Sequence, residues 1–341
     1  MASGTLRHPR LALALAEAEA RLERARVLVL NAPAGVDLAP LAPARSVLVQ
    51  GMKPAHDRLA RAGWTVVPEA AAAEPPFGAA VIFLPRSRAA GRAAVAEVAA
   101  RLAAGAPIWI DGQKTDGIES MAREIRARAA IEPPLAKAHG RIFRFDRPAD
   151  DPFADWQPRE MTPAPGFVTL PGLFSADRID RGSALLAEAL PARLGPLVAE
   201  FGAGWGWLAA QILRRDGVGS LDLVEADHAA LACARRNIRD PRVRFHWADA
   251  TVWQAPAPLD SVVMNPPFHS GRAAEPALGA AFVAAAARAL KPSGQLFMVA
   301  NRHLPYEGAL AADFAEVTEL GAEAGFKLIR AARPRPSRPR P

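Results

Sequence analysis

Short apolar runs that alternate with alanine-rich, helix-like segments constrain the fold of this 341-residue chain more than any other feature. In the first half, the apolar runs occupy residues 27–30, 46–50, 64–67, 79–84 and 107–110, with a helical pattern over 89–104. In the second half, they occupy residues 197–201, 220–225, 243–247, 260–264 and 295–300, with helical patterns over 229–239 and 277–290. Strands that alternate with helices form a parallel sheet covered on both faces. The sequence therefore predicts an α/β protein with two doubly wound, Rossmann-like domains.

Proline-rich segments suggest where the chain divides. Residues 131–165 contain many prolines and are the best candidate for an interdomain connection, although Phe143 and Trp156 could pack in a core. We expect one domain over residues 1–150 and a second over residues 151–330. Residues 331–341 resemble an Arg-Pro repeat, which cannot build a core, so we expect a disordered tail there.

The two halves show the same order of strand and helix patterns, which suggests a degenerate internal duplication, although unrelated doubly wound domains can also look this alike. The turns after the strands differ between the halves. In the first half, residues 31–35 lack close-set glycines, the second strand ends in Gln50 rather than an acid, and residues 84–86 read Leu-Pro-Arg. If the halves are related, the first domain has lost its small-molecule site.

Charge and cysteine content restrict the possible partners. Lys plus Arg number 42 against 35 Asp plus Glu, a net charge of +7, which favours a polyanionic partner such as RNA unless it reflects only an Arg-rich proteome. The single cysteine, Cys233, excludes an internal disulfide framework and a Cys-rich zinc site, and its helical surroundings favour a place in the core. Because no apolar stretch reaches the length of a membrane span, we expect no membrane partner and a cytoplasmic protein. We also expect a monomer.

The segment Asn265-Pro266-Pro267-Phe268-His269 follows the fourth apolar run of the second half. Such a turn presents a side-chain amide oxygen and a backbone carbonyl as neighbouring hydrogen-bond acceptors. The two prolines fix the backbone and remove two competing N–H donors. The aromatic ring adds a stacking face. This arrangement suits a flat molecule that carries a planar NH2 group, such as a nucleobase, and therefore predicts methyl transfer to nitrogen.

Two earlier turns of the second half have the features of a cofactor site. Gly202, Gly204 and Gly206 alternate after the first strand, where they permit a tight turn and a close backbone approach to a ligand. Glu225 ends the second strand, where a carboxylate can accept hydrogen bonds from the ribose hydroxyls of NAD or of S-adenosylmethionine. Taken alone, the glycine-rich turn would suit a phosphate equally well.

The order of the turns discriminates between these possibilities. Asp249 follows the third strand and could accept a hydrogen bond from an adenine amine, and the Asn265 turn then follows the fourth strand. A nicotinamide dehydrogenase would not need that last element. The second half thus resembles the class I S-adenosylmethionine-dependent methyltransferases. More narrowly, it resembles the RsmC and RlmG type of ribosomal RNA guanine methyltransferases.

The narrower resemblance also rests on residues 169–175, 179–183, 301–306 and 325–330. It covers residues 168–330 well and the first half more loosely, where that family carries a duplicated domain without a cofactor site. It implies transfer of a methyl group from S-adenosylmethionine to the exocyclic amine of a guanine in ribosomal RNA, with the small-subunit (16S) RNA favoured. No metal is expected, because the sulfonium of the cofactor is already activated.

The resemblance further implies a set of cofactor-binding residues: Glu200, Gly202, Gly204, Gly206, Glu225, Ala226, Asp249, Ala250 and Asn265. Glu225 would hold the ribose hydroxyls, and Asp249 would contact adenine with Ala226 and Ala250 flanking the ring. The sequence departs from the family at Glu200, where Asp is common.

On the substrate side, the resemblance implies the catalytic residues Asn265, Pro266, Pro267 and Phe268. Asn265 and the Pro266 carbonyl would hold the amine, and Phe268 would stack on the base. Two alternatives stay open. One is a protein glutamine N-methyltransferase, whose family shares an Asn-Pro-Pro-aromatic turn but has a small helical module where this chain predicts α/β structure. The other is a non-catalytic RNA-binding assembly factor that keeps the fold.

Overall fold

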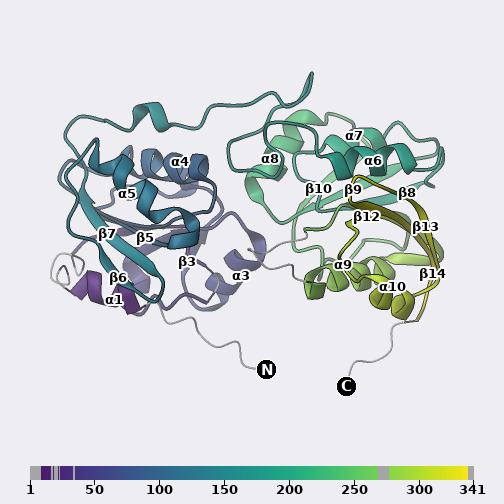
Figure 1. The fold of residues 1–341 in the computed structure, drawn as a ribbon, viewed down its shortest axis with the longest axis horizontal. Helices are drawn as coiled ribbons and strands as arrows, with labels where there is room; N and C mark the ends of the chain where they lie inside the picture. Colours follow the sequence, from purple (N-terminus) through teal and green to yellow (C-terminus); the bar gives the residue numbers. More distant parts are fainter. Residues whose placement is uncertain are drawn as a thin grey trace. The chain divides into compact units, whose positions relative to one another are not determined.

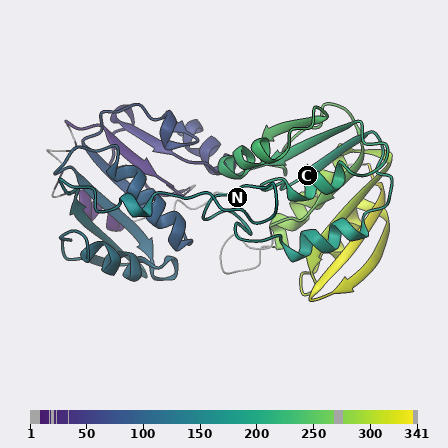
Figure 2. The same cartoon turned by 90° about the horizontal axis from the view of Figure 1, so that it is seen from above.

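All ten strands expected from the apolar runs are present in the computed structural model, which describes residues 9–16, 18, 22, 24–33, 35–267 and 276–336. The chain divides into a first unit, residues 1–160 with 170–172, and a second unit, residues 161–169 with 173–341. Each unit is built on one sheet with helices on both faces (Figures 1 and 2). Among the described residues, no helix combines the length and the apolar character needed to cross a bilayer.

The first unit contains seven strands among its described residues. They are β1 (Val27–Leu30), β2 (Ser46–Val49), β3 (Thr65–Val67), β4 (Ala79–Phe83), β5 (Pro107–Gln113), β6 (Leu135–Lys137) and β7 (Gly140–Asp146). Its α-helices are α1 (Pro9–Ala16), α3 (Lys53–Arg61), α4 (Arg88–Ala99) and α5 (Ile118–Arg126). Helix α4 begins where the Ser87 hydroxyl accepts a hydrogen bond from the Ala90 N–H, an N-cap that satisfies one of the free amides of the first turn.

The second unit also contains seven strands among its described residues. They are β8 (Leu197–Phe201), β9 (Ser220–Glu225), β10 (Val243–Trp247), β11 (Leu259–Met264), β12 (Leu290–Asn301), β13 (Phe314–Glu323) and β14 (Phe326–Pro334). Its α-helices are α6 (Arg181–Ala189), α7 (Trp207–Ile212), α8 (His228–Asn237), α9 (Pro276–Ala289) and α10 (Glu307–Asp313). Cys233 is buried on α8, which confirms the expected core role.

The two sheets have the same topology. Their strand orders are β3-β2-β1-β4-β5-β7-β6 and β10-β9-β8-β11-β12-β14-β13, so each strand of one sheet has a counterpart at the same place in the other. In each sheet the first five strands are parallel, and the two last strands of the order form antiparallel pairs. The expected doubly wound fold is confirmed, but both sheets are mixed rather than purely parallel.

Alternate residues of the central strands pack into cores on opposite faces of each sheet, as the period of two along a strand requires. Leu28 and Leu30 face the core under α4 and α5, whereas Val27 and Val29 face the core under α1 and α3. In the second unit, Figure 1 shows α6 and α7 on one face and α9 with α10 on the other. Both faces of each sheet are thus covered, which leaves the ends of the strands to form a site.

Two boundaries differ from those expected. Residues 131–146 do not belong to a loose connection, because β6 and β7 extend the first sheet and bury Ile142, Phe143 and Phe145. Arg141 and Arg144 interrupt this apolar run, so it does not stand out in the sequence. Residues 331–334 do not begin a tail, because Ala331 and Ala332 pair with both β12 and β13. Residues 337–341, the rest of the expected tail, lie outside the described residues.

Candidate active site

The glycine-rich turn between β8 and α7 has left-handed backbone at all three glycines. The φ angles are +75° at Gly202, +56° at Gly204 and +91° at Gly206, values that favour glycine strongly. A Cβ at Gly206 would approach Ala234 of α8 to 3.3 Å, whereas a Cβ at Gly204 would meet nothing within 4 Å. Gly206 therefore permits close packing of a helix, and Gly204 leaves open space in front of the turn.

Glu225, at the end of β9, holds the glycine-rich turn in place. Its two carboxylate oxygens accept hydrogen bonds of 2.7 Å each, one from the Gly204 N–H and one from the Asp227 N–H. Burial raises the pKa of Glu225, and the hydrogen bonds from Asp227 and Gly204 partly oppose that effect. Asp227 in turn caps α8 by accepting from the N–H groups of Ala229 and Ala230. The acid at the second strand is therefore part of the turn and not only a solvated strand end.

Glu200, on β8 just before the glycines, is buried with 2% of its surface exposed. Its Oε2 is one of the few buried side-chain oxygens among the described residues that have no hydrogen-bond donor. Burial raises the pKa of Glu200 well above its ordinary value, and the nearby Glu225 carboxylate raises it further. Two acids close together in a low-dielectric site favour binding of a cation.

Asn265 immediately follows β11 and has a partly buried side chain. Its Nδ2 donates to Asp180 Oδ2 at 2.8 Å and to Ser183 Oγ at 2.9 Å. Its Oδ1 is buried and has no donor among the described residues. Both N–H groups of the amide therefore bind acceptors of the protein, and its oxygen remains for a ligand.

The rest of the Asn265 motif is described in part. Pro266 is buried and Pro267 is exposed. Phe268, the residue expected to stack on the base, lies outside the described residues. Asn265 and Glu200 both line one small cleft, together with Gly202, Gly204, Phe174, Ser175, Asp180 and Ser183.

The residues expected around adenine do not line that cleft. Asp249 closes its own turn after β10, where its Oδ1 accepts from the Thr251 N–H at 2.8 Å and from Thr251 Oγ1 at 2.7 Å. The Ala226 carbonyl accepts a 2.9 Å hydrogen bond from Trp247 Nε1, which ties the ends of β9 and β10 together. Ala250 is buried in the core on the α9 side of the sheet.

Three functional candidates of the site have no role assigned from the sequence. Asp180 and Ser183, at the start of α6, bind Asn265, which is 82 residues or more distant in the chain. Phe174 lines the same cleft with its side chain 64% exposed. A phenylalanine in this largely apolar segment does not stand out in the sequence, and its exposure beside a site becomes evident only in the fold.

The bulky Trp205 inside the glycine-rich turn is buried. Its indole Nε1 donates to the Phe174 carbonyl at 3.1 Å, and its ring packs edge-on against Phe167. The Asn237 side chain fixes the same turn by donating to the carbonyls of Trp205 and Val168. Trp205 therefore anchors the turn to the segment before α6.

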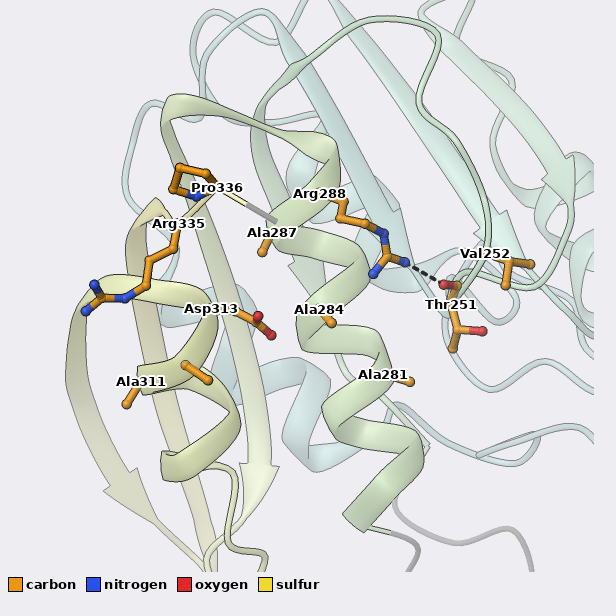
Figure 3. A pocket seen from close by; sticks show the side chains of 11 residues that line it. Thr251, Val252, Ala281, Ala284, Ala287, Arg288, Ala311, Asp313, Arg335 and Pro336 are labelled. Atoms are coloured by element: carbon orange, nitrogen blue, oxygen red, sulfur yellow. Dashed lines mark hydrogen bonds between the residues drawn. The ribbon is translucent and has the colours of Figure 1, made fainter. Parts of the chain in front are cut away.

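Size alone does not identify the site. A cavity of about 830 Å³ lies against the alanine face of α9, near the end of α10 and the loop after β10 (Figure 3). Ala281, Ala284 and Ala287 line it, and Arg288 crosses it to donate to the Thr251 carbonyl. None of the residues predicted to bind cofactor or substrate lines this cavity. The described residues also contain no group of three His, Cys, Asp or Glu side chains placed to hold a metal ion.

Comparison with known proteins places the chain in a family. Residues 165–330 match the model of the Methyltransferase small domain family. A ribosomal RNA small subunit methyltransferase C from Pseudomonas paraeruginosa is 32% identical over 266 residues, which are 76% of this chain and 80% of that protein. The chain belongs to the ribosomal RNA small subunit methyltransferase C family. The expected class of S-adenosylmethionine-dependent methyltransferases is thereby confirmed.

Other members of the family match over a similar extent. The protein of the same name from Hahella chejuensis is 29% identical over 284 residues, covering 79% of this chain and 82% of its own length. Among solved structures, a T. thermophilus 16S rRNA N2 G1207 methyltransferase (RsmC), in complex with AdoMet and guanosine, matches with a TM-score of 0.76 and 26% identity. That match covers 90% of this chain and 88% of the other. The likeness therefore extends beyond the second unit.

Proposed function

We propose that this chain transfers the methyl group of S-adenosylmethionine to the exocyclic amine of a guanine in 16S ribosomal RNA. The single observation that carries the proposal is a pair of buried oxygens without a donor, Glu200 Oε2 and Asn265 Oδ1, on two residues that line one cleft. A buried acceptor without a partner costs roughly 1–3 kcal/mol. Ligands that carry N–H bonds would satisfy both groups. A cofactor with an ammonium group and an amine substrate are such ligands.

On the cofactor side, S-adenosylmethionine supplies a methyl group on a positively charged sulfur together with an ammonium group. The buried Glu200 carboxyl group lines the cleft and can pair with such a cation when it ionises. The open space in front of Gly204 lets the backbone of the turn approach the ligand. Glu225, already fixed by two backbone N–H groups, keeps further acceptor capacity for ribose hydroxyls. We assign Asp249, Ala226 and Ala250 to the adenine end.

On the substrate side, Asn265 Oδ1 and the Pro266 carbonyl would accept the two N–H bonds of the guanine amine. The lone pair of that amine is delocalised into the ring, and two acceptors on its N–H bonds favour the geometry in which the lone pair can attack. The same dipoles stabilise the positive charge that develops on nitrogen during transfer. Fixed placement of both reactants can lower the barrier by up to ~7–11 kcal/mol. We assign stacking on the base to Phe268.

We further propose that the division of labour follows the two units. The second unit carries the whole reaction, and the first unit, over about residues 1–150, binds RNA or braces the fold. A ribosomal substrate implies that the enzyme acts in the cytoplasm, and we expect it to act as a monomer.

The test is the Asn265→Ala variant, because it removes the acceptor and leaves the glycine-rich turn intact. We expect methyl transfer to fall by roughly 10²–10³-fold, the loss typical for one preorganised polar group, while S-adenosylmethionine binds with little change. Transfer of labelled methyl is measured on 16S RNA, on large-subunit RNA, on assembled small subunits and on protein, and cofactor affinity is measured by calorimetry. Unchanged turnover would contradict the role of Asn265, and label in protein alone would contradict the substrate.

A further inference from the structure

The side-chain amide of Asn265 can in principle bind in two orientations. Rotation by half a turn exchanges its oxygen, which accepts hydrogen bonds, with its NH2 group, which donates them. Only one orientation presents an acceptor to the cleft, and only an acceptor can bind an amine. The reaction therefore depends on what holds the amide in that orientation.

The protein supplies two partners at the amide nitrogen. Asp180 Oδ2 lies 2.8 Å and Ser183 Oγ 2.9 Å from Asn265 Nδ2. An ionised carboxylate offers only acceptors, so Asp180 can bind the NH2 group and would repel the oxygen. Ser183 can accept or donate and so does not choose an orientation by itself. The choice rests on Asp180.

Asp180 is itself fixed by the start of α6. The same oxygen, Oδ2, accepts the Ser183 N–H at 2.7 Å as the N-cap of the helix. A Cβ at Gly182 would lie 3.1 Å from this oxygen and 3.1 Å from the Phe326 ring, closer than nearly all real Cβ contacts. The glycine thus permits β14 and the N-cap carboxylate to pack against the same turn, which leaves the carboxylate little freedom to move.

We propose that Asp180, assisted by Ser183, is a positioning residue that locks the Asn265 amide with its oxygen toward the substrate. This proposal rests on the proposed function and adds a source of selectivity to it. A locked acceptor binds the exocyclic amine of guanine and rejects the carbonyl on the same base, because two acceptors repel. In this role Asp180 acts through Asn265.

Substitution by serine separates the lock from the helix cap. Asp180→Ser keeps a good N-cap residue, but the serine side chain is too short to reach Asn265. If Asp180 served only as a helix cap, this variant would keep its activity. With the lock, we expect kcat to fall by roughly 10–100-fold, with KM for S-adenosylmethionine and the melting temperature nearly unchanged. Asp180→Asn should retain activity within about threefold, because its amide oxygen can still accept both bonds.

A paired substitution tests the contact itself. Asn265→Asp sets two carboxylates against each other at the 2.8 Å contact and should abolish transfer. Adding Asp180→Asn removes one of the two negative charges from that contact and leaves a carboxylate oxygen at position 265 facing the cleft. We expect the double variant to be at least about tenfold more active than Asn265→Asp alone, a coupling of the size seen for contacting residues. Equal activity of the two would overturn the lock.

Asp240→Ser is the matched control. Asp240 also accepts a backbone N–H and a side-chain donor, both from Arg242, and contacts no residue of the site. We expect its kcat to equal that of the wild type.

One further measurement does not need activity. In protein labelled at asparagine, the side-chain amide protons of Asn265 should exchange slowly in the wild type and quickly in Asp180→Ser, as followed by NMR with Asn265→Ala for assignment. Fast exchange in the wild type would overturn the lock whether or not the enzyme methylates RNA. Slow exchange in a wild type that transfers no methyl to 16S RNA would instead overturn the proposed substrate and leave the lock in place.

Discussion

The two units share one strand order, so each residue at a strand end in one unit has a counterpart in the other. Leu30 of β1 pairs with Val49 of β2, and Phe201 of β8 pairs with Val224 of β9 in the same register. The chain then turns after each of these strands. The positions that form the cleft in the second unit can therefore be read directly in the first.

At the first two strands, polar groups of the second unit correspond in position to apolar or internally paired groups of the first unit. Glu200, with its unpaired oxygen, corresponds to Val29, which is fully buried in an apolar core. Glu225 corresponds to Gln50, which accepts the Met52 N–H as Glu225 accepts the N–H of Asp227. The acid pair of the second unit thus has no equivalent in the first.

The second hydrogen bond of Gln50 and of Glu225 joins each side chain to the loop after the first strand of its sheet. The side chain is the donor in the first unit and the acceptor in the second. Gln50 Nε2 donates to the Ala32 carbonyl at 2.9 Å, whereas Glu225 Oε2 accepts from the Gly204 N–H at 2.7 Å. In the first unit the amide closes the turn and satisfies both partners. In the second unit the carboxylate leaves negative charge at the mouth of the turn.

The fourth strand shows the same contrast. Asn265 follows Met264, the partner of Phe201, and Phe83 follows Ile82, the partner of Leu30. Phe83 is buried, and so the substrate acceptor of the second unit is replaced by an aromatic side chain packed in a core.

Charge is also buried in the first unit, but there it is paired. The Arg10 guanidinium donates to both oxygens of Asp111 and to two backbone carbonyls of the turn between β6 and β7. At these strand ends the polar groups of the first unit are paired, whereas the second unit retains two unpaired acceptors, Glu200 Oε2 and Asn265 Oδ1, at a cost of roughly 1–3 kcal/mol each. Unpaired acceptors at the strand ends therefore distinguish the site from its degenerate copy.

At the cofactor end, we expect the largest effect when a residue of the second unit is replaced by its counterpart from the first. Glu225→Gln provides only one acceptor where the carboxylate provides two, and it removes the negative charge. Hydrogen bonds to charged groups contribute roughly 1.5–3 kcal/mol each, so we expect S-adenosylmethionine to bind roughly 100-fold more weakly. Calorimetry measures the affinity, and the melting temperature checks that the fold is kept, as Gln50 shows is possible. An unchanged affinity would mean that Glu225 only braces the turn.

The second substitution, Glu200→Gln, removes the more strongly perturbed acid. We expect S-adenosylmethionine affinity to fall by roughly 10–30-fold at neutral pH, because a buried charged partner of the cation is lost. In the wild type, affinity should rise with pH as Glu200 ionises, since the cation binds the carboxylate and not the acid. That rise should be much smaller in Glu200→Gln, and calorimetry at several pH values distinguishes the two proteins.

The stability of the cofactor-free protein should depend on pH in the direction opposite to that of the cofactor affinity. The pKa of Glu200 is higher in the folded protein than the ordinary 4.5, so the folded state holds its proton to a higher pH than the unfolded chain does. The free energy of unfolding of the cofactor-free protein should therefore fall as pH rises above about 4.5. The raised pKa values of Glu225 and Asp227 act in the same direction. Glu200→Gln should reduce this fall, and denaturant titrations that show an equal fall in both proteins would contradict the burial argument.

The sequence predicts the parts of this contrast that depend on residue type and order. Glycines after β8, an acid after β9 and asparagine after β11 are local signals, and so is the missing acid at Gln50. The sequence does not predict that Asp180 binds Asn265, because that contact joins the start of α6 to the end of β11 across 85 residues. It likewise hides β7, whose apolar residues are interrupted by two half-buried arginines, Arg141 on one face of the strand and Arg144 on the other. Tertiary contacts decide both features.

Phe174 lies in the site but at no strand end, so it has no place in the comparison of the two units. Its side chain is 64% exposed beside Asn265, and an exposed aromatic at such a site can stack on a base. Because stacking contributes roughly 1–3 kcal/mol per base, we expect Phe174→Ala to lower kcat/KM for RNA by at least about fivefold without changing cofactor affinity. Leu320→Ala, an exposed apolar residue on β13, is the matched control. Equal loss in both variants would argue against a contact with the base.

The smallest effect on activity is expected in the first unit, where the reverse substitution tests whether the degenerate copy can be restored. Gln50→Glu would set a carboxylate against the Ala32 carbonyl, which now accepts from the amide, and would leave that buried carbonyl without a donor. We expect the first unit to lose roughly 1–3 kcal/mol of stability, with methyl transfer and S-adenosylmethionine affinity unchanged. Denaturant unfolding measures the loss, and calorimetry counts the cofactor sites. A second cofactor site in this variant would contradict the view that Val29 and Phe83 have closed the cleft, because a single acid cannot reopen a site whose other polar groups have been replaced by core.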